Sequence, residues 1–263
     1  MSQHKIFAIR PEVTSEAVEA LRPKKCQDEP VSTPPYELIE WEDEMTGVEM
    51  SVAVIKARGV LALNVDGWYG CCDLDELAEE IEEADADANV TAIIVEMDSP
   101  GGTVNGTPEA AERIARITKP LMVWTEGELC SAAYWVTASA DVIYSTPSAV
   151  VGSVGCVLAF YDYSAMLDQS GIKVQVFRSG ELKAAGYPGT ALSEAEAAHF
   201  QGMVAEVGSD FADWVTTYRD SLDLDVLDGR SVSGKQGLRL GLLDGVFITR
   251  EEAVKSFLER INL

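Results

Sequence analysis

The chain has 263 residues, of which 47% are hydrophobic and 24% charged, and its formal net charge is −24. This composition is ordinary for a folded globular protein and argues against general disorder. The excess of Asp and Glu would repel a phosphate backbone, so we expect no nucleic-acid partner.

Targeting and metal-binding patterns are also missing from the sequence. No run of about 18 or more uncharged apolar residues appears, and the first residues lack the apolar region of a signal peptide, which predicts a soluble, cytoplasmic protein without a membrane anchor. Five cysteines without Cys-x-x-Cys spacing fit a reducing compartment. His4 and His199 are far apart, so we expect no metal and no cofactor.

The first part of the chain, residues 1–49, is predicted to be an N-terminal arm and linker. It contains a short helical stretch from Pro11 to Leu21, a proline-bearing segment and an acidic run from Glu40 to Glu44. After Met50 the sequence becomes rich in β-branched and apolar residues, SVAVIKARGVLALNV, which predicts one or two strands. We expect a single domain over 50–263.

Helical and strand-like segments then alternate along the chain. The predicted helices LDELAEEIEEADADANV, PEAAERIARIT and SAAYWVTASA are each followed by a strand, TAIIVEM, PLMVWTE and DVIYST. The alternation predicts an α/β fold with a parallel sheet flanked by helices. A long amphipathic helix over 193–219 with Ser193 as N-cap, a further helix, a short strand over 243–248 and a closing helix complete the prediction.

Two junctions between a strand and a helix carry candidate chemistry. Ser99-Pro100-Gly101-Gly102 follows a strand, where glycines can bring bare N–H groups close to a ligand and stabilise an oxyanion, or can serve only a tight turn. Ser131 stands at the next such junction, where helix N–H groups favour developing negative charge. It is either a nucleophile or a helix cap.

A serine nucleophile needs a base. His4 lies in the N-terminal arm and His199 lies inside the long helix, where a helix-face position is the simpler interpretation. A lysine can serve when burial favours its neutral form. Lys183 follows the β-like run GIKVQVF and is the leading candidate, although composition alone also allows an ordinary surface lysine.

In their order along the chain, these motifs resemble the signal peptide peptidase A family of the ClpP/crotonase superfamily, and most closely its phage prohead or head-maturation proteases of the minor capsid protein C type. The similarity covers roughly residues 50 to 260. Its segments are Gly59, Ser99-Pro100-Gly101-Gly102, Ser131-Ala132-Ala133-Tyr134, Ala138-Ser139-Ala140-Asp141, Gly152-Ser153-Val154-Gly155, the Gly-x-x-Lys segment ending at Lys183, and Gly241-Leu242-Leu243-Asp244.

The resemblance implies a serine endopeptidase of ClpP/crotonase-type fold, with repeated ββα units, that works as a homo-oligomer. It assigns Ser131 as nucleophile and Lys183 as base of a Ser-Lys dyad. It places oxyanion donors at the backbone amides of Gly102, with Gly101 as neighbour, and of Ala132. Ser153 would orient the lysine amine, or it is a turn serine.

The start Ile9-Arg10-Pro11-Glu12 is similar to that of phage head proteases, which implies scaffold, portal or capsid polypeptides as substrates and a location in the host cytoplasm or prohead. Three alternatives remain: a soluble cellular signal-peptide-peptidase-like protease, a catalytically silent capsid-associated protein, and an acyl-CoA enzyme of the crotonase type. The N-terminal arm is either removed by self-cleavage, for which we expect a site between residues 23 and 50, or is a docking tether.

Overall fold

The computed structural model describes residues 7–9, 36–42, 47–65 and 70–261. The helix expected from Pro11 to Leu21 and most of the proline-bearing segment after it lie outside these residues. No helix in the described ranges is both long and apolar enough to span a membrane.

The central sheet has six strands in the order β13-β10-β8-β6-β3-β2. The strands β3 (Glu49–Arg58), β6 (Ala92–Asp98), β8 (Leu121–Thr125), β10 (Val142–Ser145) and β13 (Gly245–Val246) are parallel to their neighbours, and β2 (Glu37–Glu42) pairs antiparallel with β3 at the edge. β2 therefore adds residues from before position 50 to the sheet. A mostly parallel sheet confirms the predicted α/β class.

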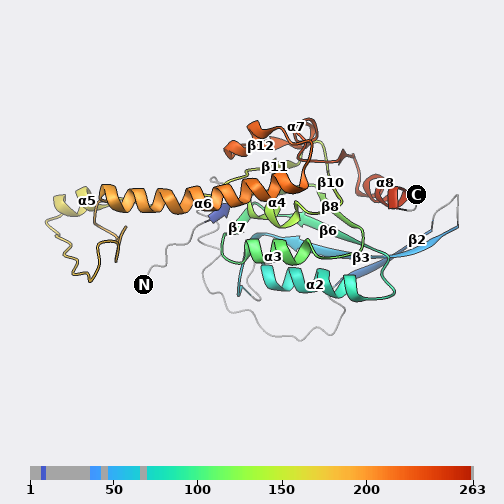
Figure 1. Cartoon of the computed structure of the whole chain (residues 1–263), viewed down its shortest axis with the longest axis horizontal. Coiled ribbons are helices and arrows are strands. Elements are labelled where there is room, and N and C mark those ends of the chain that lie inside the picture. Colours follow the sequence, from blue (N-terminus) through green and yellow to red (C-terminus); the bar gives the residue numbers. More distant parts are fainter. Residues whose placement is uncertain (1–6, 10–35, 43–46, 66–69, 262–263) are drawn as a thin grey trace.

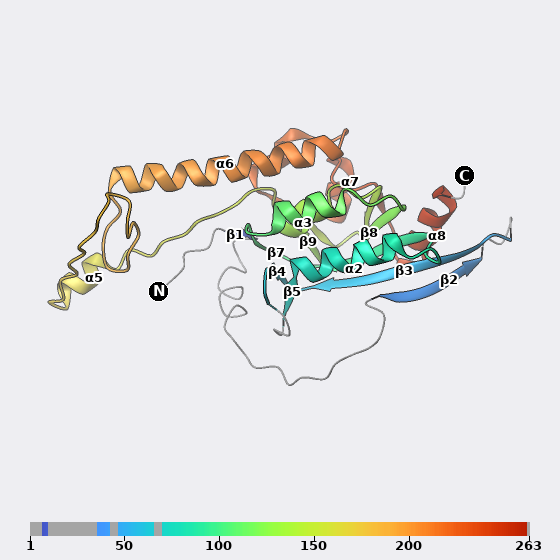
Figure 2. The ribbon, with the colours of Figure 1, turned by 60° about the horizontal axis from the view of Figure 1, so that its bottom comes forward.

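Helices cover both faces of this sheet, which explains why its inner strands β6, β8 and β10 are mainly apolar (Figures 1 and 2). On one face, α2 (Leu74–Ala86), α3 (Thr107–Ile114) and α4 (Ala132–Thr137) pack on residues such as Ile55, Ile93 and Val123. On the other face, α8 (Arg250–Ile261) packs on Ile94 and Met122. Successive residues of one strand thus enter two different cores.

Each long strand is followed by a short strand that leaves the main sheet. β4 (Val60–Ala62) and β7 (Gly101–Thr103) belong with β1 (Phe7–Ile9) and β5 (Cys71–Asp73) to a four-stranded sheet of order β1-β7-β4-β5. β9 (Glu128–Cys130) and β11 (Val150–Gly152) form a three-stranded sheet with β12 (Ser231–Ser233). This long strand, short strand and helix order is the expected repeated ββα unit.

The predicted long helix is confirmed as α6 (Glu194–Tyr218), which begins with a capping box of Ser193 and Glu196. Its C-terminal half packs on the body, where Phe211 stacks on Trp135 at 4.4 Å between ring centroids. At its end Arg219 donates to the carbonyl oxygens of Ala138 and Ala140. The 3-10 helix η2 (Leu224–Asp228) and α7 (Gly234–Arg239) follow.

The N-terminal half of α6 projects away from the body and carries residues 157–192, which we call the projecting arm (Figures 1 and 2). The arm contains α5 (Ser164–Gln169), and almost all of its residues are exposed or half-buried. The expected β-like run over 171–177 is wrong, because these residues form no strand and Phe177 is 94% exposed. Among the residues that the structure describes, no strand pairs with this run.

Candidate functional site

Ser131 joins β9 to α4 and is completely buried. Its backbone angles, φ 55° and ψ −122°, are close to those of the first central residue of a type II′ turn, which strongly favours glycine. The Ser131 side chain makes no capping hydrogen bond to α4, so the interpretation as a helix cap is wrong. Instead the Ser131 hydroxyl donates to the carbonyl oxygen of Gly155 at 3.3 Å.

The Ser99-Pro100-Gly101-Gly102 segment lies beside this junction. The Ser99 amide donates to the Glu128 carbonyl oxygen at 2.7 Å, and the Cys130 amide donates to the Ser99 carbonyl oxygen at 3.2 Å. Gly101 has φ 108° and begins β7. A Cβ atom at Gly102 would stand 1.7 Å from the Leu61 carbonyl oxygen, so this position requires glycine. The start of β7 and the end of β9 therefore meet next to Ser131.

Ser153 lies next to Ser131 for a reason of register. Cys130 and Gly152 are partners in the parallel strands β9 and β11, and each serine is the residue that follows. The Ser131 amide donates to the Gly152 carbonyl oxygen at 2.8 Å. Ser153 is 5% exposed and also has a left-handed backbone, with φ 54°. The structure thus brings these two predicted site residues together.

A cavity of about 320 Å³ opens beside them. The carbonyl group that accepts the Ser131 hydroxyl belongs to Gly155, one of the residues that line it. Burial raises the pKa of the Cys156 thiol, so this neighbouring cysteine is a poor source of thiolate. The cavity is lined by Ser153, Val154, Gly155, Cys156, Val157, Val204, Gly208, Leu227, Asp228 and Gly229.

Lys183 lies elsewhere, in the projecting arm, where it is exposed. In the described part of the chain its ammonium group forms no hydrogen bond or ion pair and is not joined to Ser131. The apolar residues Val154 and Val157 line the cavity beside Ser153, not the surroundings of Lys183. Within one chain, the structure does not bring the predicted base to the predicted nucleophile.

Backbone strain nevertheless marks the same positions. Four non-glycine residues of the described ranges have positive φ, and they are Asn64, Ser131, Ser153 and Ala184. Two of them are predicted site residues, and Ala184 follows Lys183 directly. Non-glycine residues in this region carry strain that clusters at functional sites, so these outliers support a functional role for all three segments.

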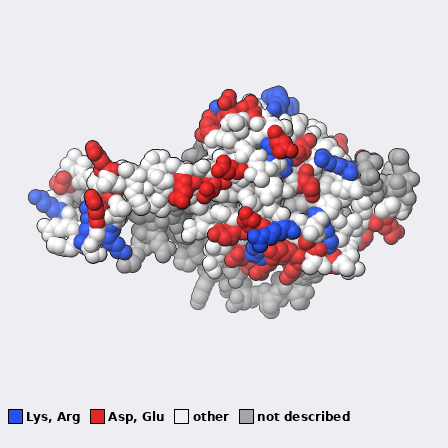
Figure 3. Space-filling model, viewed as in Figure 1, with Lys and Arg blue, Asp and Glu red and all other residues white. Residues whose placement is uncertain are grey.

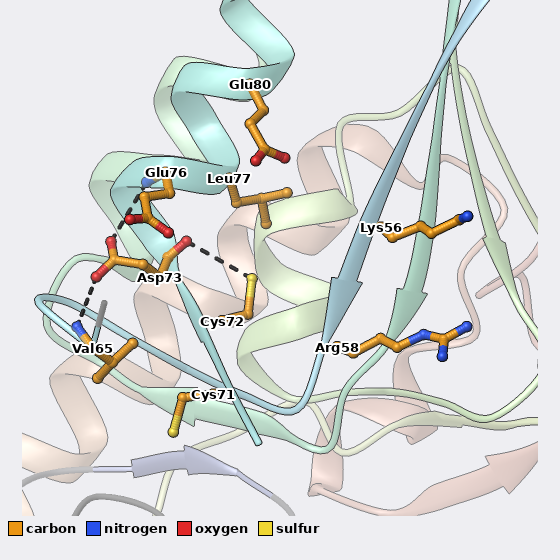
Figure 4. Close-up of a pocket in the computed structure, with 9 residues that line it drawn as sticks. All are labelled: Lys56, Arg58, Val65, Cys71, Cys72, Asp73, Glu76, Leu77 and Glu80. Atoms are coloured by element: carbon orange, nitrogen blue, oxygen red, sulfur yellow. Dashed lines mark hydrogen bonds between the residues drawn. The ribbon is translucent and has the colours of Figure 1, made fainter. Parts of the chain in front are cut away.

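A second cavity of about 330 Å³, which the sequence did not predict, lies between α2 and the end of β3 (Figure 4). It holds the adjacent cysteines of β5 together with three carboxylates and two basic side chains. Burial, followed by the charges of Glu80, Asp73 and Glu76, raises the pKa of the Cys72 thiol to about 12. A protonated thiol is a weak nucleophile, so Cys72 is a poor candidate for a base or nucleophile.

His199 is exposed on α6 beside Phe200, as a helix-face residue would be. Strand β1 is the other feature that the sequence did not predict. It pairs antiparallel with β7 and so lies next to Gly101 and Gly102. Three residues, Phe7 to Ile9, are too few to show a periodic pattern, so no sequence signal marked this contact.

A peptidase family model and several proteins named as proteases match this chain. A model of peptidase family S49 matches residues 113–263. A Methanocaldococcus jannaschii protein named as a candidate protease is 30% identical over 70% of this chain and 60% of its own length. Capsid assembly protease C of Escherichia phage lambda is 28% identical over 73% of this chain and 46% of its own length. This chain spans about half the length of the curated relatives that it matches.

Among solved structures, a serine-to-alanine mutant of the membrane-bound stomatin-specific protease 1510-N has a TM-score of 0.50 with this chain. The superposition covers 78% of this chain and 82% of that one, at 15% sequence identity. At this level the likeness concerns the fold alone.

Proposed function

The chain belongs to peptidase family S49, and from that membership we propose that it is a serine endopeptidase with Ser131 as nucleophile. The observation that carries the proposal is the conformation of Ser131, a buried non-glycine residue with φ 55° whose hydroxyl turns from its own helix toward the cavity. Such strain costs about 1–3 kcal/mol and persists where the position is needed for function. The proposed catalytic domain spans residues 50–263.

The proposed oxyanion donors are the backbone amides of Gly102 and Ala132, with Gly101 as neighbour. They belong to β7 and to the first turn of α4, which pack together beside Ser131. Backbone amides that are fixed before reaction stabilise developing negative charge without reorganisation. The need for glycine at position 102 supports this assignment, since a side chain would push the strand away from β4.

The Gly155 carbonyl oxygen holds the Ser131 proton but cannot remove it, so a base must come from elsewhere. We propose Lys183 of a neighbouring copy of the chain, oriented by Ser153. The arm that carries Lys183 exposes large apolar side chains, and exposed apolar patches commonly mark interfaces. These side chains are Tyr161, Met166, Ile172, Phe177, Leu182 and Tyr187.

Charge supports the same arrangement. The arm carries three basic residues, Lys173, Arg178 and Lys183, and three acidic ones, whereas the whole chain has 20 Lys and Arg against 44 Asp and Glu. Figure 3 shows basic side chains at the arm end and many acidic ones over the body. The arm itself therefore has no net charge, so it meets less repulsion at a second, strongly acidic copy than a stretch with the average charge of the chain would.

In the proposed mechanism, Ser131 Oγ attacks the peptide carbonyl carbon while the neutral Lys183 amine accepts the hydroxyl proton. The amides of Gly102 and Ala132 stabilise the oxyanion. Protonated Lys183 then donates to the leaving amine, and water hydrolyses the acyl-enzyme. Contact with the second copy would remove water from Lys183, which favours its neutral form.

The substrates are proposed to be scaffold, portal or capsid polypeptides, cleaved in the host cytoplasm or prohead. The support is the similarity to capsid assembly protease C of phage lambda. A cellular role is the second candidate, since a protein of Enterococcus faecium named for signal peptide peptidase A is 27% identical over 64% of this chain.

The test is intact-mass spectrometry of an unstructured protein, or a co-expressed scaffold protein, incubated with wild type, Ser131→Ala and Lys183→Ala. Of these three proteins, the proposal expects only wild type to cleave. Lys173→Ala, in the same exposed arm, is the matched control and should cleave like wild type. Equal cleavage by wild type and Ser131→Ala would overturn the proposal, and no cleavage by any variant would favour the silent capsid-associated protein.

A further inference from the structure

Strand β1 occupies one edge of β7. The two strands are antiparallel, and the register pairs Phe7 with Thr103, Ala8 with Gly102 and Ile9 with Gly101. Figures 1 and 2 both place β1 beside β7. A segment near the start of the chain thus lies on the strand that carries the proposed oxyanion amide.

The other edge of β7 is already taken by β4, since Leu61 is the parallel partner of Gly102. A peptide that adds to β7 as a strand can therefore use only the edge where β1 lies. Strand addition is a common way for an extended peptide to bind, because main-chain hydrogen bonds supply affinity whatever the side chains. β1 occupies the position that a bound peptide substrate would take.

The register identifies one residue of β1. In an antiparallel ladder, directly opposite residues exchange their N–H and C=O groups at every second pair. The register places Ala8 directly opposite Gly102. A Gly102 amide that points toward β1 therefore meets the carbonyl group of Ala8. If Gly102 stabilises the oxyanion, the peptide bond aligned for attack is the one between Ala8 and Ile9.

We propose that β1 is an intramolecular substrate of this protein, cut between Ala8 and Ile9. The inference rests on the proposed function. Ser131 Oγ forms a bond to the Ala8 carbonyl carbon, and its proton passes to the base. The Ala8–Ile9 C–N bond breaks, the base returns the proton to the Ile9 nitrogen, and the fragment ending at Ala8 stays as an ester on Ser131. Water then releases it as a carboxylic acid and restores the hydroxyl.

Two consequences follow from this position. Before the cut, β1 occupies the edge of β7 that β4 does not cover and so excludes other peptides from it. The uncut chain is therefore a poorer protease. The cut requires the base, which one chain does not place at Ser131, so cleavage waits for assembly with a second copy. Residues 1–8 are then a segment whose removal opens the site, and the cut falls outside the 23–50 range that composition favoured.

The test uses the full chain with a C-terminal tag only, followed by intact mass and N-terminal sequencing during incubation, with an unstructured protein present as a second substrate. Wild type should yield a chain that begins at Ile9, and Ser131→Ala should stay uncut. Ala8→Pro removes the amide that pairs with β7 and should lower the rate of the 8–9 cut at least tenfold. Gln3→Pro lies outside β1 and should not.

The outcomes separate the two proposals. If wild type cleaves the added protein in a Ser131-dependent manner while its own N-terminus stays uncut at Ile9, self-cleavage is overturned and the proposed function stands. A cut elsewhere in residues 1–49 also overturns it. If the added protein is cleaved equally by Ser131→Ala, the proposed function fails, and the inference fails with it.

Discussion

The hydroxyl group of Ser131 donates a hydrogen bond of 3.3 Å to the carbonyl oxygen of Gly155. A backbone carbonyl can accept such a bond but is far too weak a base to take the proton. The single chain therefore holds a strained and oriented serine in a resting state, with a cavity beside it and no lysine attached in the described residues. This relationship leads to predictions about strain, packing and assembly.

The first prediction compares two substitutions of Ser131. Ser131→Ala and Ser131→Gly should both lower peptidase activity by roughly 10³-fold or more, because each removes the nucleophile. Glycine adopts positive φ without strain, whereas alanine does not. Ser131→Gly should thus be more stable than Ser131→Ala by about 1–3 kcal/mol, measured by urea denaturation. Equal stability would contradict the strain that we assign to this position.

The second prediction concerns Gly102. A Cβ atom there would overlap the Leu61 carbonyl oxygen, so Gly102→Ala must displace β7 from β4. We expect loss of both activity and thermal stability. Gly202 on α6 is exposed with open space around it, and Gly202→Ala should instead stabilise the helix by about 0.5–1 kcal/mol. Thermal unfolding of both variants checks the contrast, and a stable, active Gly102→Ala would refute it.

The third prediction is a pH dependence at the second cavity. Burial, followed by the charges of Glu76 and Glu83, raises the pKa of Glu80 to about 7. An unfolded glutamate has a pKa of about 4.3. Between these values the folded chain binds more protons, so its stability falls as pH rises through this window. Glu80→Gln removes that loss.

The stability gain from Glu80→Gln over wild type should therefore be larger at pH 8 than at pH 5, as measured by urea midpoints. Glu79→Gln, at an exposed neighbouring position on α2, removes the same unit of negative charge and is the control. If both variants show the same difference between pH 5 and pH 8, burial of Glu80 is not the cause.

The fourth prediction concerns the anchor of α6. Arg219 forms an ion pair of 2.6 Å with Asp244, and the Asp244 carboxylate also accepts from the Ile143 amide. Arg219→Ala should destabilise the fold by about 3 kcal/mol, because it leaves a partly buried carboxylate and two carbonyl groups without their donor. Arg116→Ala breaks only an exposed pair with Glu112 and should change stability by about 0.5 kcal/mol or less. Chemical denaturation distinguishes the two.

The sequence predicted those parts of the site that depend on local pattern. Gly101, Gly102 and Ser131 each follow an apolar strand and precede a helix, and parallel strands end at one edge of a sheet. The strands also appear at the predicted places because their residues are apolar on both faces. Fold class and the neighbourhood of the proposed nucleophile could thus be predicted before the structure was known.

Other parts could not be predicted from pattern. Lys183 follows a run that alternates like a strand, but in the described ranges no strand pairs with this run, which projects from the body with α6. The position of α6 depends on a few contacts near its end, such as Phe211 on Trp135, which periodicity does not specify. The contact of β1 with β7 joins residues nearly a hundred positions apart and depends on backbone pairing, which composition does not encode.

The most direct test of the account mixes two inactive variants. Ser131→Ala supplies an intact Lys183 and Lys183→Ala supplies an intact Ser131, so an assembly of both contains some complete sites if the dyad joins two copies. We predict that each variant alone fails to cleave an unstructured protein and that a co-refolded equimolar mixture regains a measurable fraction of wild-type cleavage. A mixture that stays as inactive as its components, or a Lys183→Ala variant that is fully active alone, would contradict the proposed dyad between neighbouring copies.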